Sequence, residues 1–466
     1  MSLRDPADKR SGYPAPFAAP PHPQWELHSK PTPFLLTANE LGYLWHPTTS
    51  TVGTPTLLRA TSRQLEPPVR LPSPNDSDVL PLGETNFHDR HELFGMHQTD
   101  RLRHFFTTGK TGQGKSTLLQ NMIVNDMKAG RGLLVIDPHG ELYDDVLPFV
   151  PPHRRDNLIA FDPADSTQPW GINLLSGVTE ENRTKIKDSV MLTFFRLFDI
   201  DQSSAPRLTY ILQNSIHTLL DTPGSSLIDI EELLISRPMR NRLIRNIKDT
   251  PDRTSVLNFW TEFQSWNDRY RTEAIAAVLN KVSLFASDPL LRRALEADRK
   301  QLNLRQAMDE QKIVLINLSK GRMGEFGSSL LGSFIVTALQ IGTLSRADIP
   351  HAQRQHFFAF IDEFQNFATD SFATILSEAR KYGLGLTLSN QYLGQLDTVL
   401  SAVLGNVGSL MTFQIGSQDA RIFADELGED LHPRDFMRLP QYTAYLRLMV
   451  NGTMTVPFSM KTLPPP

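Results

Sequence analysis

Seven short apolar segments of the chain each end in polar or turn residues, and a long stretch of different character separates them into two groups. The segments are HFFTTG, GLLVIDPHG, NLIAFDP, KIVLINLS, FFAFIDEF, LGLTLSN and SLMTFQIG. Their apolar residues run together instead of alternating with polar ones, as strands covered on both faces require. Helical patterns lie between several of them, so the sequence predicts an α/β fold with a mostly parallel sheet of βαβ units.

The stretch from Thr179 to about Leu295 shows helical spacing of its apolar residues instead. Examples are RTKIKDSVMLTFFRLF, PRLTYILQNSIHTLLD, DIEELLISR and EAIAAVLNKVSLFA. Apolar residues three and four positions apart lie on one face of a helix. The pattern predicts an all-α insertion domain, residues 179–295, which divides the α/β domain into residues 101–178 and 296–466.

The N-terminal part of the chain is rich in proline. Residues 1–33 include YPAPFAAPPHPQWELHSKPTP, and proline lacks a backbone N–H and fixes φ, so we expect a disordered or extended arm. In residues 34–100, short apolar pieces such as PFLLTANELGYLW alternate with proline and polar turns. This pattern predicts a small strand-containing N-terminal module with some helix.

Composition sets outer limits on the protein. The 466 residues are 40% hydrophobic and 21% charged, an ordinary globular balance that predicts two or three domains. The chain has no cysteine, which excludes disulfides and thiolate metal sites. Its net charge of −4 argues against a protein coated in basic surface but leaves room for a local basic channel. No stretch approaches ~18 consecutive apolar residues, so we expect a cytoplasmic protein.

A phosphate-binding motif follows the first of the seven segments. GKTGQGKS has the full G-x-x-x-x-G-K-[ST] spacing, with a predicted strand before it and an amphipathic helix after it. Its glycines let backbone N–H groups converge on phosphates at a helix N-terminus, where Lys115 adds charge and the Ser116 hydroxyl can hold Mg²⁺. The residues expected to bind ATP are Gly109, Lys110, Thr111, Gly112, Gln113, Gly114, Lys115, Ser116 and Thr117.

An acidic pair ends the apolar segment FFAFIDEF. In a Walker B arrangement, Asp362 would bind the Mg²⁺ and Glu363 would orient or deprotonate the attacking water. A pair of acidic residues at the end of a strand also serves commonly as a helix N-cap. The phosphate-binding motif upstream favours the catalytic interpretation.

Two further residues are candidates for catalysis. Gln391 follows the segment LGLTLSN, and its amide can donate and accept, so it could report whether the γ-phosphate is present. Arg380, in SEARKYG, could neutralise transition-state charge across a subunit boundary, although a surface salt bridge is the commoner use of such an arginine.

A turn after the second apolar segment, DPHGE, should lie at the same edge of the sheet as the phosphate-binding motif. Asp137 and Glu141 are therefore candidates for lining the site. His139 has no cysteine or histidine at ligand spacing, and we interpret it as a turn histidine.

Two basic segments could contact nucleic acid. A predicted helix in the insertion, PMRNRLIRNIK, favours a solvated basic face over DNA contact. The segment SKGRMG carries Lys320 and Arg322 among glycines, and we expect it to form a loop that either contacts phosphates or is a plain exposed turn. The basic residues of the predicted helix are Arg240, Arg242, Arg245 and Lys248.

With these motifs in place, the chain from about Leu82 onward resembles the HerA/FtsK superfamily of ring-forming DNA pumps, and most of all the coupling proteins of type IV secretion and conjugation. The resemblance rests on GKTGQGKST, VIDPHGEL, INLSKGRMGE, FIDEFQNF, SEARKYGLGLTLSNQYLGQL and GNVGSLMTFQIGSQDA, in family order. It implies a RecA-like P-loop ATPase that uses ATP and Mg²⁺. It also implies a ring of identical subunits, usually a hexamer, with ATP between subunits, DNA in the channel and Arg380 acting in trans.

Coupling proteins usually carry N-terminal transmembrane helices, and here a proline-rich arm stands in that place. Either the anchor is absent, or a separate membrane subunit supplies it, or the reading frame is shortened. We expect an ATP-driven motor that moves DNA or nucleoprotein, with a relaxase or other secretion components among its partners. The alternatives are an ATPase of the same superfamily that acts on protein, a DNA-processing translocase unrelated to secretion, and a receptor that uses nucleotide only to hold a ring together.

Overall fold

The computed structural model describes residues 62–466 except residues 89, 202, 369, 397–398 and 429–430. The chain separates into two compact units, Met1–Arg59 and Ala60–Pro466, and all the described residues belong to the second. The predicted proline-rich arm and the part of the predicted N-terminal module up to residue 61 lie outside the described residues.

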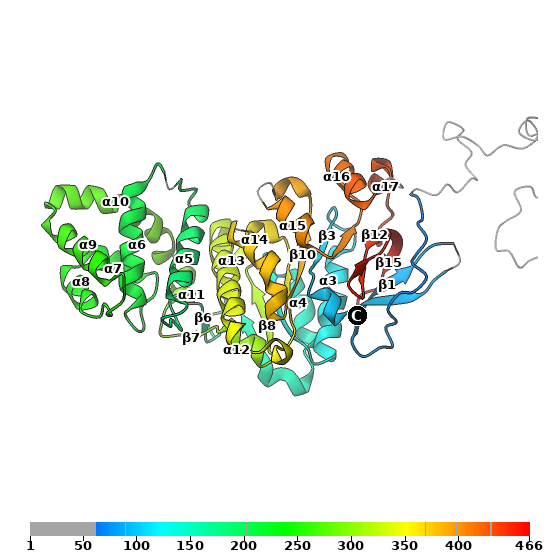
Figure 1. Ribbon diagram of the computed structural model, residues 1–466, viewed down its shortest axis with the longest axis horizontal. Helices are drawn as coiled ribbons and strands as arrows, with labels where there is room; N and C mark the ends of the chain where they lie inside the picture. The colour runs from blue at the N-terminus through cyan, green and yellow to red at the C-terminus, as the bar shows by residue number, and fades with distance from the viewer. Residues whose placement is uncertain (1–61, 89, 202, 369, 397–398, 429–430) are drawn as a thin grey trace, which may run out of the picture. The chain divides into compact units, whose positions relative to one another are not determined.

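An eleven-stranded sheet organises the second unit (Figure 1). The strand order is β2-β1-β15-β12-β11-β3-β10-β9-β4-β8-β5. Its strands are β1 (Val79–Thr85), β2 (Leu93–His97), β3 (Phe105–Thr108), β4 (Gly132–Asp137), β5 (Leu158–Phe161), β8 (Ile313–Asn317), β9 (Phe357–Ile361), β10 (Leu384–Asn390), β11 (Ser409–Thr412), β12 (Thr443–Arg447) and β15 (Phe458–Thr462).

The seven strands from β11 to β5 are parallel, and each is one of the seven apolar segments. Strands β12, β15, β1 and β2 extend the sheet in antiparallel pairs. The sequence predicted strands in a small N-terminal module, and the structure has two strands there, β1 and β2. They do not form a separate sheet, because β1 pairs with β15 of the main sheet. An isolated two-stranded ribbon is only marginally stable, whereas pairing with the sheet buries its apolar face.

Alternate strand residues point to opposite faces of the sheet, and each face has its own helices. On one face, Phe105 and Leu133 pack with α3 and α4; on the other, Phe106 and Leu134 pack with α13 and its neighbours. Both faces are covered, which explains the continuous apolar runs. These helices are α3 (Lys115–Lys128), α4 (Glu141–Val146), α12 (Leu304–Asp309), α13 (Lys320–Ser345), α14 (Asp370–Glu378), α15 (Leu400–Asn406), α16 (Ser417–Leu427) and α17 (Pro433–Met437).

The regular elements among the described residues of the predicted insertion are all helices, and its core continues the core of the α13 face. Helix α5 packs on α13, where the buried hydroxyls of Thr193 and Thr337 lie 2.9 Å apart (Figure 1). The domain limits proposed from the sequence stay a prediction. The helices are α5 (Arg183–Leu197), α6 (Pro206–Leu220), α7 (Asp229–Ile235), α8 (Arg237–Ile244), α9 (Arg253–Ser265), α10 (Asp268–Ala286) and α11 (Pro289–Leu295).

The two connections between the insertion and the sheet domain are joined to each other. Strand β6 (Trp170–Gly171) pairs in parallel with β7 (Lys300–Gln301), and the Leu302 N–H donates to the Gly171 carbonyl at 2.8 Å. The Lys300 amine lies 4.2 Å from the centre of the Trp170 ring. The base of the insertion is therefore fixed, although the connections carry little periodic signal.

Helix α13 is the longest of the described helices. Together with the turn up to Asp348 it is long and apolar enough to cross a membrane, but 78% of its apolar window is buried against the sheet and the insertion. One bent pair, α10 with α11, would pass the same test only if it were a single span. The burial of α13 is that of a core helix.

The remaining short elements connect these layers. They are α2 (Gln98–Arg101), β13 (Met449–Val450), β14 (Thr453–Met454), η1 (Leu147–Phe149), η2 (Pro152–Asn157), η3 (Arg346–Asp348), η4 (His351–Gln353), η5 (Phe364–Asn366), η6 (Ala379–Tyr382) and η7 (Leu393–Gln395).

Candidate active site

The predicted phosphate-binding motif is a loop between β3 and the first turn of α3. Gly112 has φ 76° and Gly114, the N-cap of α3, has φ 114°. Side chains other than hydrogen rarely permit these angles, so glycine is needed at both positions. The loop thus leads into a helix N-terminus, whose free N–H groups and dipole favour a bound phosphate.

Lys115 begins α3, and its side chain turns back toward the loop. The amine donates to the carbonyl of Gly109 and, at 3.1 Å, to the carbonyl of Lys110. Burial lowers the pKa of Lys115, while the nearby carboxylates of Asp362 and Glu363 act in the opposite direction. The hydrogen bonds that hold the amine at the phosphate loop are thus made to neutral carbonyl groups, which a phosphate anion can replace.

Asp362 and Ser116 supply oxygen atoms that suit a magnesium ion. Asp362 directly follows β9, and desolvation of its carboxyl raises its pKa. Ser116 lies in the first turn of α3 with its side chain exposed. A carboxylate and a hydroxyl are the kinds of ligand that Mg²⁺ takes in nucleotide sites.

Glu363 is held by four side chains, three from other segments and one from its own. Its backbone has φ 43° and ψ 50°, an uncommon conformation for a residue other than glycine. Gln391 donates to one carboxylate oxygen; the other lies 2.9 Å from His139 Nε2, 3.3 Å from Asn366 Nδ2 and 4.0 Å from Lys320 Nζ. The carboxylate is thereby fixed at the edge of the sheet beside Asp362.

The surroundings of Glu363 keep it ionised. Burial alone would raise its pKa, but the hydrogen bond and charge of His139, with smaller effects of Asn366 and Lys320, hold the pKa below its ordinary value. A carboxylate that stays charged can accept a proton from, or orient, a water molecule.

His139 owes its place to the turn after β4. The carboxylate of Asp137 accepts hydrogen bonds from the N–H groups of His139 (2.8 Å) and Tyr143 (2.9 Å). Asp137 thus orders the turn that presents His139 to Glu363, whereas the side chain of Glu141 is exposed. The position of the turn at this edge could be predicted, but the His139–Glu363 contact could not, because only the order of the strands makes β4 and β9 neighbours.

Gln391 and Arg380 differ in their relation to this cluster. Gln391 follows β10, the strand between β3 and β9, and bonds directly to Glu363. Arg380 lies in η6, after α14, and its side chain is exposed.

The segment from residue 319 to 324 was predicted as a loop, and that prediction is wrong. It forms the first turn of α13, which is interrupted at Gly324 (φ 73°, ψ 165°). Lys320 donates to Asn366 at 3.0 Å, and Arg322 pairs with Asp162 at 2.6 Å. Both cations are thus engaged within the chain, and Lys320 belongs to the cluster around Glu363.

The basic segment in the insertion is also partly structural. Arg240 is buried and donates to the carbonyls of Leu233 and Leu234 at the end of α7, at 3.1 and 3.0 Å. A charged donor that satisfies free carbonyls at a helix C-terminus stabilises that terminus. Arg240 therefore does not belong to a solvated basic face.

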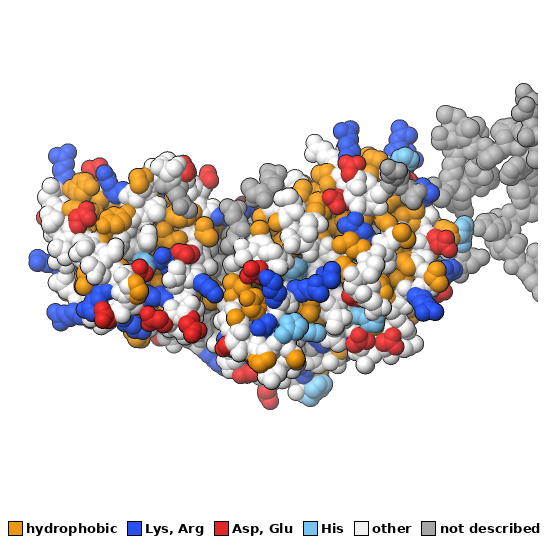
Figure 2. Space-filling view, in the orientation of Figure 1, with side chains coloured by type: hydrophobic (Ala, Val, Ile, Leu, Met, Phe, Trp, Pro, Cys, Tyr) orange, Lys and Arg blue, Asp and Glu red, His pale blue; other side chains and the backbone are white. Residues whose placement is uncertain are grey.

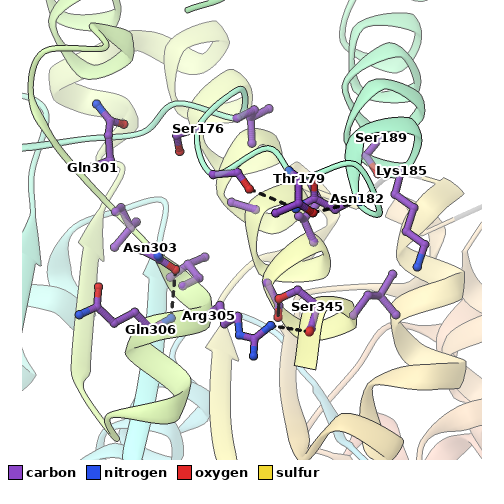
Figure 3. Close-up of a pocket in the computed structure, with 18 of the residues that line it drawn as sticks. Ser176, Thr179, Asn182, Lys185, Ser189, Gln301, Asn303, Arg305, Gln306 and Ser345 are labelled. Atoms are coloured by element: carbon purple, nitrogen blue, oxygen red, sulfur yellow. Dashed lines mark hydrogen bonds between the residues drawn. The ribbon is translucent and has the colours of Figure 1, made fainter. Parts of the chain in front are cut away.

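A cavity of about 650 Å³ lies at the base of the insertion, between α5, α12 and α13 (Figure 3). Several polar groups in its lining bond to each other: Asn182 accepts from the Thr179 N–H at 2.7 Å, and Asn303 accepts from the Gln306 N–H at 3.0 Å. None of the residues around Glu363 or the phosphate loop lines it. The cavity is thus separate from the candidate active site.

The comparison with protein families finds one match. Residues 98–338 match the family described as the central domain of the helicase HerA, which is just over half of the chain. No curated protein matches the sequence significantly.

Solved structures with a similar fold include a plasmid coupling protein and a VirB4 protein. The plasmid coupling protein TrwB in complex with ADP and Mg²⁺ is 17% identical with a TM-score of 0.60, over 87% of this chain and 96% of that one. VirB4 of Thermoanaerobacter pseudethanolicus is 14% identical with a TM-score of 0.56, over 84% of this chain and 97% of that one. At such identities the likeness shows a shared fold, the RecA-like P-loop fold.

Proposed function

Because the chain belongs to the HerA helicase central-domain family, we propose that it is an ATPase motor that moves DNA or nucleoprotein toward a type IV secretion or conjugation channel. The observation that carries the proposal is the meeting of Lys115, Glu363 and Gln391 at one edge of the sheet, although they come from distant parts of the chain. A plasmid coupling protein and a VirB4 protein share the fold, which supports the secretion context.

The roles of the residues follow from their positions. The loop Gly109–Thr117 would hold the phosphates of ATP, and Lys115 would exchange its carbonyl partners for the terminal phosphates. Ser116 and Asp362 would hold Mg²⁺, which neutralises charge on the phosphates when it is bound. Glu363 would orient the attacking water and receive its proton, with Gln391 linking its carboxylate to β10.

The proposal that the protein moves DNA is based on the family to which the chain belongs and not on a basic surface seen in Figure 2. On the face drawn in Figure 2, Lys and Arg side chains are interspersed with Asp, Glu and apolar side chains. Arg322, a candidate for phosphate contact, pairs with Asp162 instead. DNA would therefore be held by a channel formed when subunits assemble, with contributions from several copies.

We propose a ring of identical subunits, a hexamer by analogy with the superfamily, with ATP between neighbours. The exposed Arg380 would then reach the nucleotide of the adjacent subunit and neutralise charge in the transition state. A relaxase or another secretion component would deliver the DNA. The protein would work in the cytoplasm or at the inner membrane through a partner.

ATP turnover by the purified protein tests the proposal. Hydrolysis should require Mg²⁺, rise when DNA is added, and disappear in Lys115→Ala. Arg380→Ala should also lose hydrolysis, and mixing it with Glu363→Gln subunits should restore activity, because each variant then supplies the residue that the other lacks. Turnover that is the same with and without DNA would favour the alternative, an ATPase that acts on protein.

A further inference from the structure

The segment directly before β12 is bonded to the tip of the phosphate loop. Gln441 Nε2 donates to the carbonyl of Gly112 at 2.7 Å, and the Tyr442 N–H donates to the carbonyl of Gln113 at 3.0 Å. These contacts join parts of the chain 329 positions apart in sequence. The loop is thus braced from the side of the sheet that lies away from Glu363.

Tyr442 has an uncommon conformation that the brace maintains. Its φ is 62°, in the left-handed region that residues other than glycine rarely adopt. Its Cδ1 atom lies 2.9 Å from the position that a Cβ on Gly114 would take, so the ring lies against the N-terminus of α3. The residue is nevertheless 46% exposed. A strained backbone therefore keeps a partly open aromatic ring beside the phosphate loop, and such strain is typical of functional positions.

The order of the strands says which part of a nucleotide would reach this ring. Strands β10 and β9, which carry the residues expected to act at the γ-phosphate, lie on one side of β3, while β11 and β12 lie on the other. A triphosphate with its terminal end toward Glu363 must therefore direct its nucleoside toward β12. Tyr442 directly precedes β12 and lies on this nucleoside side.

The last residues of the described chain complete the same side. The carbonyl of Tyr442 accepts from the Thr462 N–H at 2.9 Å. Beyond Thr462, the carbonyls of Leu463 and Pro464 accept from Asn121 of α3 at 3.3 and 2.9 Å. Hydrogen bonds therefore connect Tyr442 through the C-terminal residues to the second turn of α3, beside the helix N-terminus where the phosphates would bind.

We propose that Tyr442 stacks on the base of the bound nucleotide and that it distinguishes a nucleoside triphosphate from a bare polyphosphate. The proposal rests on the proposed function as a nucleotide-binding enzyme. Every base presents a flat π face, so the contact adds affinity for a purine nucleotide without requiring one particular base.

A comparison of two ligands distinguishes stacking of Tyr442 on the base from its support of the phosphate loop. The affinities of the magnesium complexes of ATP and inorganic tripolyphosphate are measured by calorimetry for the full chain and its variants. Tyr442→Ala should weaken ATP on the order of 10-fold and leave tripolyphosphate unchanged, whereas Tyr442→Phe should bind both normally. Gln441→Ala, which removes the brace at Gly112 and keeps the ring, should weaken both ligands by the same factor.

Equal weakening of both ligands by Tyr442→Ala, or no weakening of ATP, would overturn the base contact. A small loss of folded protein would not change the result, because it lowers the apparent binding of both ligands equally. The ratio of the affinities for ATP and tripolyphosphate, compared between Tyr442→Ala and Tyr442→Phe, therefore reports on the base contact. Lys115→Ala should lose both ligands. If the unmodified protein bound neither ligand, the proposed function would fail and the base contact with it.

Discussion

The helical insertion and the edge of the parallel sheet both bury charged side chains, but they satisfy them differently. In the insertion, Arg183 and Asp221 bond through two pairs of atoms, and Asp221 also accepts from the Lys248 N–H at 3.2 Å. At the sheet edge, Lys115 donates to two carbonyl groups and has no ion pair among the described residues, and desolvation raises the pKa of Asp362. Buried charged side chains that form an ion pair stabilise the fold. A charged side chain without an ion-pair partner is instead available to bind a ligand.

The largest difference should appear when the carboxylate of Glu363 is neutralised. We expect Glu363→Gln to lower ATP turnover about 1000-fold, about 4 kcal/mol in the activation barrier, while the affinity for MgATP stays close to that of the unmodified protein. The reason is that the amide keeps the shape of the side chain but cannot take a proton. Single-turnover hydrolysis and equilibrium nucleotide binding measure the two quantities. Loss of binding would place Glu363 in the nucleotide-holding set instead.

The buried pair in the insertion should act on stability and not on turnover per folded molecule. Asp221→Ala leaves the Arg183 guanidinium buried without its carboxylate, and the free energy of unfolding should fall by about 3–5 kcal/mol. Asp249→Ala is the matched control, because the Asp249–Arg253 pair is exposed and should contribute less than about 0.5 kcal/mol. Urea unfolding of both variants checks this. Equal effects would mean that burial of the pair does not matter.

A smaller effect is expected at His139, which positions the carboxylate of Glu363 from the turn after β4. His139→Ala should lower the rate of ATP turnover about 10-fold with little change in nucleotide affinity, because a less constrained Glu363 orients water less well. His139→Gln, which can still donate a hydrogen bond, should recover part of the rate. The exposed His153 provides the control, and its alanine variant should behave as the unmodified protein. An unchanged rate in His139→Ala would remove His139 from the mechanism.

Two buried histidines, His104 just before β3 and His217 in the insertion, allow a pH comparison. Burial lowers the pKa of His104 and of His217 to about 4, from an ordinary value of 6.5. The folded protein keeps both neutral, while the unfolded chain takes up protons below about pH 6.5. The stability that they contribute is therefore complete above pH 6.5 and is lost as the pH falls toward 4.

Each histidine should account for up to about 1.4 kcal/mol of stability per pH unit within that window. His104 accepts a hydrogen bond from the Leu386 N–H at 3.1 Å, which protonation would break. Because the two pKa values are lowered to the same extent, we expect His104→Asn and His217→Gln to flatten the acid side of the stability curve by similar amounts. Urea unfolding at pH 7.5, 6 and 5 measures the slopes. Parallel slopes in the variants and the unmodified protein would show that neither histidine titrates in this range.

Much of the candidate nucleotide site could be predicted from the sequence because it is local. The spacing of Gly109, Gly114 and Lys115 lies within one loop, and Asp362 with Glu363 ends one apolar strand. Parallel strands bring such ends to the same edge of a sheet, so their proximity could be expected from topology alone. The bond between Gln391 and Glu363 agrees with that expectation.

The sequence by itself determined the seven parallel strands, the glycine-rich loop predicted to bind phosphate and the main helices of the insertion, because each depends on a periodic or contiguous pattern. Only the tertiary structure decided that His139 and Lys320 reach Glu363, that β1 joins β15, and that Tyr442 braces the phosphate loop. These contacts join segments separated by long stretches of chain, and pairing at long range leaves no mark on local hydrophobic spacing. The fold could therefore be predicted from its strands, whereas the surroundings of the site depended on how those strands were ordered.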